Sequence, residues 1–145
     1  MAKNEWWTAP AEADNGNLVI VTGRDCLAKE IESGKYDFRV EVTLNYEAVS
    51  GGMPDKESSV LMERVTDALS EELSREKAVI MTGIYTGDGK REWIFYTKNL
   101  RIFSSVFNRA LAGLPVIPFE INAYSDPEWE EYRLMKDMTY ILPED

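Results

Sequence analysis

The segment Lys77–Lys98, near the middle of the chain, constrains the fold more than any other stretch. It consists of two strand-forming runs joined by Gly87-Asp88-Gly89, residues that tolerate positive φ where a chain reverses direction. Side chains alternate across a strand, yet neither face of either run is polar. A hairpin that is apolar on both faces needs a covering layer on each, so we predict that it lies inside a sheet between two layers.

The same glycines loosely resemble a phosphate-binding loop, because Gly83, Gly87 and Gly89 precede Lys90. The spacing from Gly83 to Gly89 is one residue too long for the Walker pattern, and Arg91 stands where Ser or Thr would bind magnesium. A strand-forming run follows, whereas the phosphate loop is followed by a helix. We therefore interpret the glycines as a hairpin turn.

The segments around the hairpin have the periodicity of strands and amphipathic helices. The predicted strands are Leu18–Thr22, Asp37–Tyr46 and Val116–Tyr124, the last with Ile117, Phe119, Ile121 and Ala123 inward. The predicted helices are Lys56–Glu76 after an Asp55 cap, the segment up to Ala112 after an Asn99 cap, and Pro127–Met135 after an Asp126 cap.

From Asp37 onward, the predicted order is strand, helix, strand, strand, helix, strand, which is the split βαβ order of ferredoxin-like domains. We therefore predict an α+β fold: an antiparallel sheet with two main helices on one face, an extra N-terminal strand and a short C-terminal helix. The opposite face of the sheet then needs another cover.

Aromatic residues near the two ends of the chain are the expected cover. Residues 1–17 are mostly polar and predict an irregular arm that carries Trp6 and Trp7, either as a lid over the hairpin or as an exposed binding patch. Trp129 and Tyr132 lie three residues apart and share a helix face. We expect these four residues, or a second copy of the chain, to cover the hairpin's second face.

Length and cysteine content favour one cytoplasmic domain. The 145 residues suffice for a single domain with a sizeable core. No apolar run approaches the ~20 residues needed to cross a bilayer, and the N-terminal residues lack the pattern of a signal peptide. Cys26 is the only cysteine, which excludes an internal disulfide and suits a reducing compartment.

The formal net charge of −10 disfavours binding to nucleic acid, because the average surface repels phosphate groups. The acidity is concentrated near the C-terminus, where residues 126–145 hold seven acidic and two basic residues. This end would attract a basic protein partner. The alternative interpretation is a solvated acidic surface that aids solubility.

The sequence excludes several kinds of chemistry and predicts no catalytic residue, metal site or cofactor. It has no histidine, which removes Ser-His-Asp and Cys-His nucleophile activation, and Cys26 has no evident partner for zinc. A candidate binding surface combines polar and aromatic residues, which form either a small anion pocket or internal ion pairs with aromatic packing: Trp6, Trp7, Arg24, Arg91, Glu92, Tyr96, Trp129 and Tyr132.

Several short motifs occur along the chain. The most specific is Asp126-Pro127-Glu128-Trp129-Glu130-Glu131-Tyr132; the others are Trp6-Trp7 with Pro10, Thr22-Gly23-Arg24, Gly52-Met53-Pro54, and Thr82-Gly83 with Arg91-Glu92 and Tyr96. Together these motifs resemble a bacterial protein family known as the domain of unknown function 695. The resemblance covers most of the chain and implies no established activity. Some members resemble the RNase E inhibitor B domain, an acidic ferredoxin-like protein that regulates an enzyme by binding it, which is an analogy at the level of fold.

Two function hypotheses follow from the sequence. The first is a non-catalytic cytoplasmic module that binds or regulates a protein through an acidic, tryptophan-bearing surface. The second is a small-ligand binder or enzyme with an anion pocket between the C-terminal helix and the hairpin, in which Arg24 or Arg91 holds the anion and Glu92 acts as base.

Overall fold

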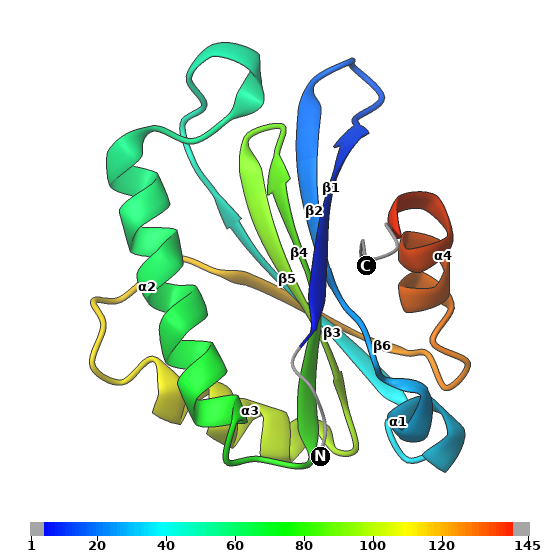
Figure 1. Ribbon diagram of the computed structural model, residues 1–145. Helices are drawn as coiled ribbons and strands as arrows, with labels where there is room; N and C mark the ends of the chain where they lie inside the picture. The colour runs from blue at the N-terminus through cyan, green and yellow to red at the C-terminus, as the bar shows by residue number, and fades with distance from the viewer. Residues whose placement is uncertain (1–4, 141–145) are drawn as a thin grey trace.

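The predicted hairpin forms the two central strands of a six-stranded antiparallel sheet (Figure 1). This computed structural model describes residues 5–140. The strand order is β1-β2-β4-β5-β3-β6, and every neighbouring pair is antiparallel. The strands are β1 (Trp6–Glu12), β2 (Leu18–Arg24), β3 (Phe38–Asn45), β4 (Val79–Gly87), β5 (Lys90–Thr97) and β6 (Glu120–Ser125).

The two long helices, α2 (Lys56–Leu73) and α3 (Leu100–Ala110), cover one face of the sheet. Both begin at the predicted caps, because the Asp55 side chain accepts a hydrogen bond from the Ser58 N–H and Asn99 caps α3 in the same way. A short 3-10 helix (Ser50–Gly52) precedes α2. Apolar side chains of both helices meet those of the sheet in the first core: Val40, Val42, Leu44, Met62, Val65, Leu69, Val79, Met81, Trp93, Phe95, Phe103, Val106 and Phe107.

The short α1 (Ala28–Ser33) and the C-terminal α4 (Glu130–Thr139) lie on the opposite side of the sheet (Figure 1). A second core fills the space beneath them: Trp7, Ala9, Val21, Leu27, Tyr36, Ile80, Ile94, Tyr96, Trp129, Tyr132 and Met135. The hairpin is thus buried on both faces, as its sequence predicts. Of the four aromatic residues expected to cover it, Trp7, Trp129 and Tyr132 are buried there, whereas Trp6 is 38% exposed.

The predicted irregular arm is wrong over residues 6–12, which form β1 and pair with β2 along its whole length. Trp7 and Ala9 alternate with exposed neighbours, so one face of the strand is buried while the other is exposed to solvent. Trp6 points to the other face for this reason. The first four residues of the expected arm lie outside the described residues.

The last two elements also begin later than predicted. β6 starts at Glu120 instead of Val116, because Pro118 has no N–H for a ladder. Its helix-facing residues Ile121 and Ala123 are exposed, because β6 lies at the edge of the sheet beyond the first core that α2 and α3 form. The last helix runs from Glu130 to Thr139 instead of Pro127 to Met135, and a turn separates it from β6.

Within residues 5–140, no helix combines the length and the apolar character that crossing a membrane requires.

Candidate functional site

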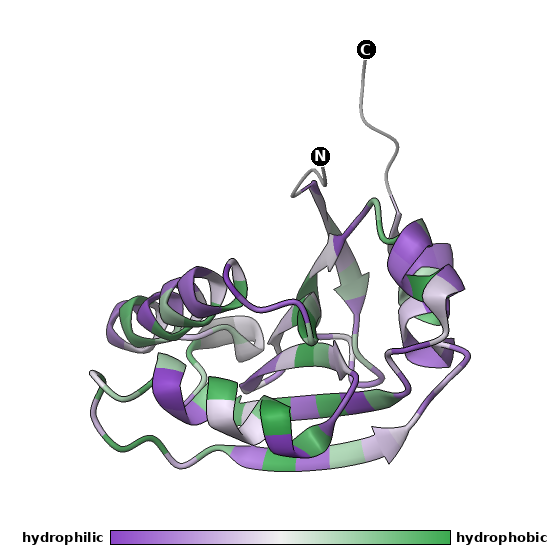
Figure 2. Ribbon diagram, turned by 90° about the horizontal axis from the view of Figure 1, so that it is seen from below, coloured by the Kyte–Doolittle hydropathy of each residue, from purple (hydrophilic) through white to green (hydrophobic). Residues whose placement is uncertain are grey.

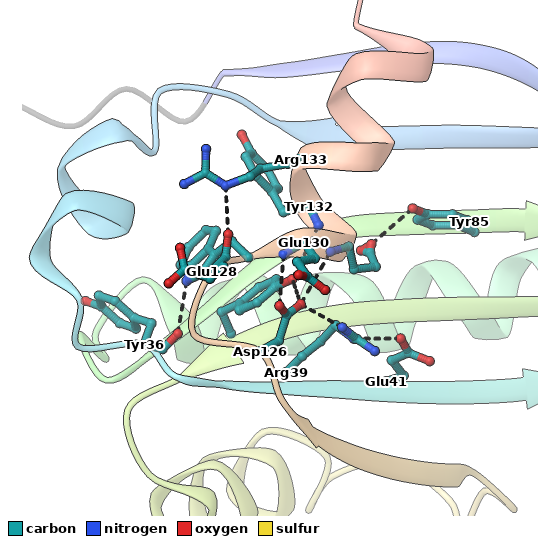
Figure 3. A network of polar contacts seen from close by, with 12 residues as sticks. Tyr36, Arg39, Glu41, Tyr85, Asp126, Glu128, Glu130, Tyr132 and Arg133 are labelled. Carbon is teal, nitrogen blue, oxygen red and sulfur yellow. Dashed lines mark hydrogen bonds and ion pairs between the residues drawn. The ribbon is translucent and has the colours of Figure 1, made fainter.

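The carboxylate of Asp126, directly after β6, is the centre of a polar network beneath the start of α4 (Figure 3). It accepts hydrogen bonds from the Tyr96 hydroxyl at 2.7 Å and from Arg39 Nη1 at 2.6 Å. It also accepts from the backbone N–H groups of Glu130, at 2.9 Å, and Glu131, at 3.4 Å. One buried carboxylate thereby joins the hairpin, β3 and the first turn of α4.

Burial by itself would raise the pKa of the Asp126 carboxyl. The hydrogen bonds from Tyr96, the Glu130 N–H and Arg39 outweigh that effect and hold the pKa below its ordinary value. The arrangement also keeps the Arg39 guanidinium charged, since the bond to Asp126 and the nearby Glu41 raise its pKa against the opposing effect of burial. Both groups are therefore ionised near neutral pH.

The aromatic residues of the C-terminal motif clamp α4 onto the sheet. The Trp129 ring stacks on Tyr96, with centroids 4.2 Å apart and ring planes 15° apart, and its Nε1–H donates to the Tyr36 carbonyl at 2.9 Å. The Tyr132 hydroxyl donates to the Arg24 carbonyl at 2.5 Å. The motif therefore acts first as a structural clamp, which explains why the network is buried.

Glu131, from the same motif, lies at the edge of the clamp. Its Oε2 accepts a hydrogen bond from the Tyr85 hydroxyl at 3.2 Å, and its Oε1 is buried with no hydrogen-bond partner among the described residues. Burial raises the pKa of this carboxyl to about 7, and the negative charge of Glu41 acts in the same direction, while the Tyr85 bond opposes both. A group of this kind can hold or release a proton near neutral pH.

Three acidic side chains gather around Tyr85 on this face of the sheet. Burial raises the pKa of the Tyr85 hydroxyl, and the charges of Glu131, Glu92 and Glu41 raise it further. The cluster therefore suits a proton or a cation better than an anion.

The candidate binding residues divide between the two faces of the sheet. Arg91 points toward α2, where its guanidinium contacts Glu63 at 3.0 Å and Thr86 Oγ1 at 2.8 Å. Glu92, the next residue along β5, points to the opposite face, and its carboxylate lies 3.7 Å from Lys90 Nζ. The structure does not bring Arg91 and Glu92 together.

The other candidates also separate. Trp7, Tyr96, Trp129 and Tyr132 are buried together in the second core, while Trp6 is on the far side of β1. The Arg24 backbone carbonyl accepts the Tyr132 hydrogen bond. Sequence analysis missed Arg39, Tyr85 and Glu131 as members of the network; the location of Glu131 inside the C-terminal motif was the one available signal.

Cys26, expected to lack a ligand partner, lies beside two carboxylates. Its Sγ donates to Glu5 Oε2 at 3.3 Å, and the ligand atoms of Glu5, Asp25 and Cys26 lie within 4.8 Å of one another. The Asp25 carboxylate already accepts from Lys136 Nζ at 3.1 Å and from the Tyr140 hydroxyl at 2.8 Å. This cluster ties the end of α4 to the turn after β2, and Lys136 supplies the positive charge at Asp25.

The free edge of β6 is a further surface of the molecule. All six residues of the strand are exposed, and β6 pairs with β3 on one side only (Figure 2, lower rim). An apolar groove of about 440 Å³ lies between β6, α3 and the segment that joins them; Phe107, Leu111, Leu114, Val116, Ile117, Phe119 and Ile121 are among its lining residues. Val116 is fully exposed, and Ile121 is 49% exposed.

The fold and the site define an α+β protein with a six-stranded antiparallel sheet, in which a C-terminal motif fastens the last helix over the second sheet face. The sequence model of DUF695, a family of unknown function, matches residues 4–135, and the chain belongs to this family. The resemblance predicted from the short motifs is thereby confirmed. Neither the curated proteins nor the solved structures yield a match.

Proposed function

We propose that this chain is a non-catalytic module that binds another protein at the free edge of β6. The observation that carries the proposal is an unpaired row of backbone N–H and C=O groups along six exposed residues, beside an apolar groove. Such an edge pairs readily with an extended segment of another chain, and an exposed apolar surface next to it adds contact area.

The opposite edge of the sheet is less suited to this role. Pro10 lies in the middle of β1 and has no N–H to donate, so it interrupts the row of donors. No proline occurs within Glu120–Ser125. The free edge of β6 is therefore the more receptive of the two edges.

The structural role of the C-terminal motif supports binding, and not catalysis, as the function of the chain. Asp126 has hydrogen bonds from four donors, and Trp129 and Tyr132 are buried against the sheet. These residues serve the fold, and the chain contains no histidine to activate a nucleophile. A regulatory role comparable to that of the RNase E inhibitor B domain, in the reducing cytoplasm, is part of the same proposal.

We further propose that the chain is a single domain with a ferredoxin-like split βαβ unit, formed by β3, α2, β4, β5, α3 and β6. Support comes from the strand order, which inserts β5 between β3 and β4, and β3 between β5 and β6. Both crossover helices contribute to one core. The continuous sheet from β1 to β6 supports the single domain.

Site-specific photo-crosslinking in the native host tests the proposed binding. A photo-reactive amino acid replaces Tyr124 on β6, which is 42% exposed, or Val60 on α2, which is 55% exposed and serves as the control. We expect a discrete crosslinked protein from position 124 and none from position 60. Equal crosslinking at both positions, or none at position 124, would count against a binding site on β6.

A second candidate function is the binding of a small cationic ligand beside α4, supported by the unpartnered Oε1 of Glu131 and the nearby Glu41 and Glu92. This revises the anion pocket predicted from sequence, because Arg91 lies on the other sheet face. Thermal-shift measurements with small amines should give stabilisation that a Glu131→Gln variant loses. An equal shift in the variant would contradict this candidate.

A further inference from the structure

We infer that the segment bound at β6 is an extended strand in which apolar and basic residues alternate. This inference rests on the proposed binding at the β6 edge and adds the chemistry of the partner. In an extended chain, successive side chains point to opposite faces, and residues opposite one another across two strands share a face. The two faces of β6 therefore specify the two sets of side chains in the partner.

The helix-facing side of β6 is apolar. Ile121 and Ala123 point to this side, and both are exposed because they lie outside the first core beneath α2 and α3. The groove continues the same surface, with Phe119 and Ile117 partly buried against the first core. Every second residue of an added strand would thus contact hydrocarbon, and burial of that surface favours apolar side chains there.

The opposite side of β6 is polar and carries one carboxylate, Glu120, beside Asn122 and Tyr124. Glu120 is exposed on this side, and Glu41 lies one strand further in, directly opposite Asn122. Two basic residues lie in this area: Arg39 is already bound to Asp126 and Glu41, and Arg133 donates from Nε to the Glu128 carbonyl at 2.7 Å. Glu128 and Glu130 follow shortly after the strand and are exposed; in Figure 3, Glu130 lies beside Asp126 and Glu128 lies beside Arg133. Lysine or arginine in the partner would therefore meet the exposed carboxylate of Glu120, which accepts a hydrogen bond from the neutral Asn45 amide at 3.4 Å.

The flanking prolines limit the length of the partner strand. Pro118 precedes β6 and Pro127 follows it, and neither residue can donate a backbone hydrogen bond. The receptive edge is therefore the six residues Glu120–Ser125.

Charge also argues against a second copy of the chain as the occupant. Each copy carries a formal net charge of −10, and a β6 strand brings its own Glu120 to the contact. Two like-charged surfaces repel, whereas a basic strand is attracted to the same edge. The homodimer suggested by the sequence is thus a competing outcome of the experiment.

Fluorescence anisotropy with labelled synthetic peptides of about eight residues tests the inference, since strands of this length are typical of sheets. The probe alternates valine and lysine. The controls are a peptide of the same composition in blocks, an alternating valine–glutamate peptide, and the probe with N-methylated backbone amides. We expect the probe to bind and each control to bind at least about tenfold more weakly, as loss of one set of contacts predicts.

Two variants of the protein locate the contact. Ile121→Ser should weaken probe binding about tenfold by removing apolar contact, and Glu120→Lys about fivefold by reversing one charge. Val60→Ser, at an exposed position of α2, is the matched control and should leave binding unchanged. Amide chemical shifts in β6 should change on titration, while those of α2 stay constant.

The outcomes separate this inference from the proposed function. Crosslinking at Tyr124 without any binding of the valine–lysine probe would overturn the inferred chemistry and leave protein binding in place. Equal binding of the valine–glutamate peptide would also overturn it. A dimer in sedimentation velocity that Ile121→Ser dissociates would assign the edge to a second copy of the chain and overturn the inference.

Discussion

The ring of Tyr96, on the central strand β5, lies stacked on the ring of Trp129 at the start of α4, with ring centroids 4.2 Å apart. The Tyr96 hydroxyl also donates to Asp126, three residues before Trp129. One tyrosine of the hairpin thus contacts both Trp129 and Asp126 of the C-terminal motif. This contact joins the middle of the sequence to its C-terminal part and places α4 over the second core.

Removal of the aromatic clamp should detach α4. Trp129→Leu is expected to lower the free energy of unfolding by about 3 kcal/mol, because it removes a fully buried ring and its hydrogen bond to the Tyr36 carbonyl. Amide hydrogen exchange in α4 should accelerate more than exchange in α2. Leu134→Ala, at an exposed position of α4, is the control and should change little. Uniform acceleration across both helices would contradict the assigned role of Trp129.

Asp126→Asn should destabilise the protein by about 2–3 kcal/mol, since it removes the charge that Arg39 and Tyr96 face in a buried site. Urea denaturation at neutral pH measures the difference. Asp137→Asn, on the exposed side of α4, is the matched control and should fall within about 0.5 kcal/mol of the wild type.

The stability difference between the wild type and Asp126→Asn should decrease at acidic pH. The pKa of Asp126 is lower in the folded protein than in the unfolded chain, where an aspartate has a pKa of about 3.9. The stabilisation is therefore complete above about pH 4 and is lost as the pH falls through the folded value. The gap between wild type and variant should narrow below about pH 4. A gap that stays constant would show that Asp126 acts through shape instead of charge.

Glu131→Gln should stabilise the protein at alkaline pH. The pKa of Glu131 is raised from 4.5 to about 7 by burial, so the folded state binds a proton more tightly than the unfolded state. Wild-type stability then falls as the pH rises from about 4.5 to 7, and the neutral glutamine avoids that cost. We expect a gain of about 1–3 kcal/mol at pH 8 that disappears near pH 4.

Glu130→Gln, one residue earlier on the exposed side of α4, is the control for the Glu131 substitution. Thermal unfolding of both variants across this pH range gives the comparison. A Glu131→Gln variant that is less stable than wild type at pH 8 would mean that the ionised carboxylate makes a favourable contact with Tyr85 or Arg39.

Gly23→Ala should destabilise the sheet where β1 pairs with β2. A Cβ at Gly23 would lie 2.1 Å from Cζ2 of Trp7, whose ring lies over this glycine. Overpacking of this kind costs about 1–3 kcal/mol. Gly113→Ala, where an added Cβ meets nothing within 4 Å, should be neutral or slightly stabilising. Equal urea midpoints for the two variants would contradict the close packing of Trp7 on β2.

Local patterns in the sequence determined much of the architecture. The Gly87-Asp88-Gly89 turn and the apolar runs beside it fixed a buried hairpin, and Asp55 and Asn99 fixed the starts of α2 and α3. These signals are local, since they depend on φ preferences, side-chain alternation and hydrogen bonds to nearby N–H groups. The predicted neighbours Trp129 and Tyr132 do contact one another, with ring centroids 5.5 Å apart, but Trp129 precedes α4 in a left-handed conformation, so the two residues do not share a helix face.

Only the tertiary structure decided which residues form the site and which surface is free. Arg39, Tyr85 and Glu131 are distant in sequence, and packing of α4 on the sheet brings them together; β1 likewise needed β2 as a partner to become a strand. β6 resembles a buried strand by alternation, yet it is exposed because it lies at the sheet edge, outside the first core beneath α2 and α3. The physical reason is that burial and pKa depend on neighbours supplied by chain topology, which residue periodicity does not encode.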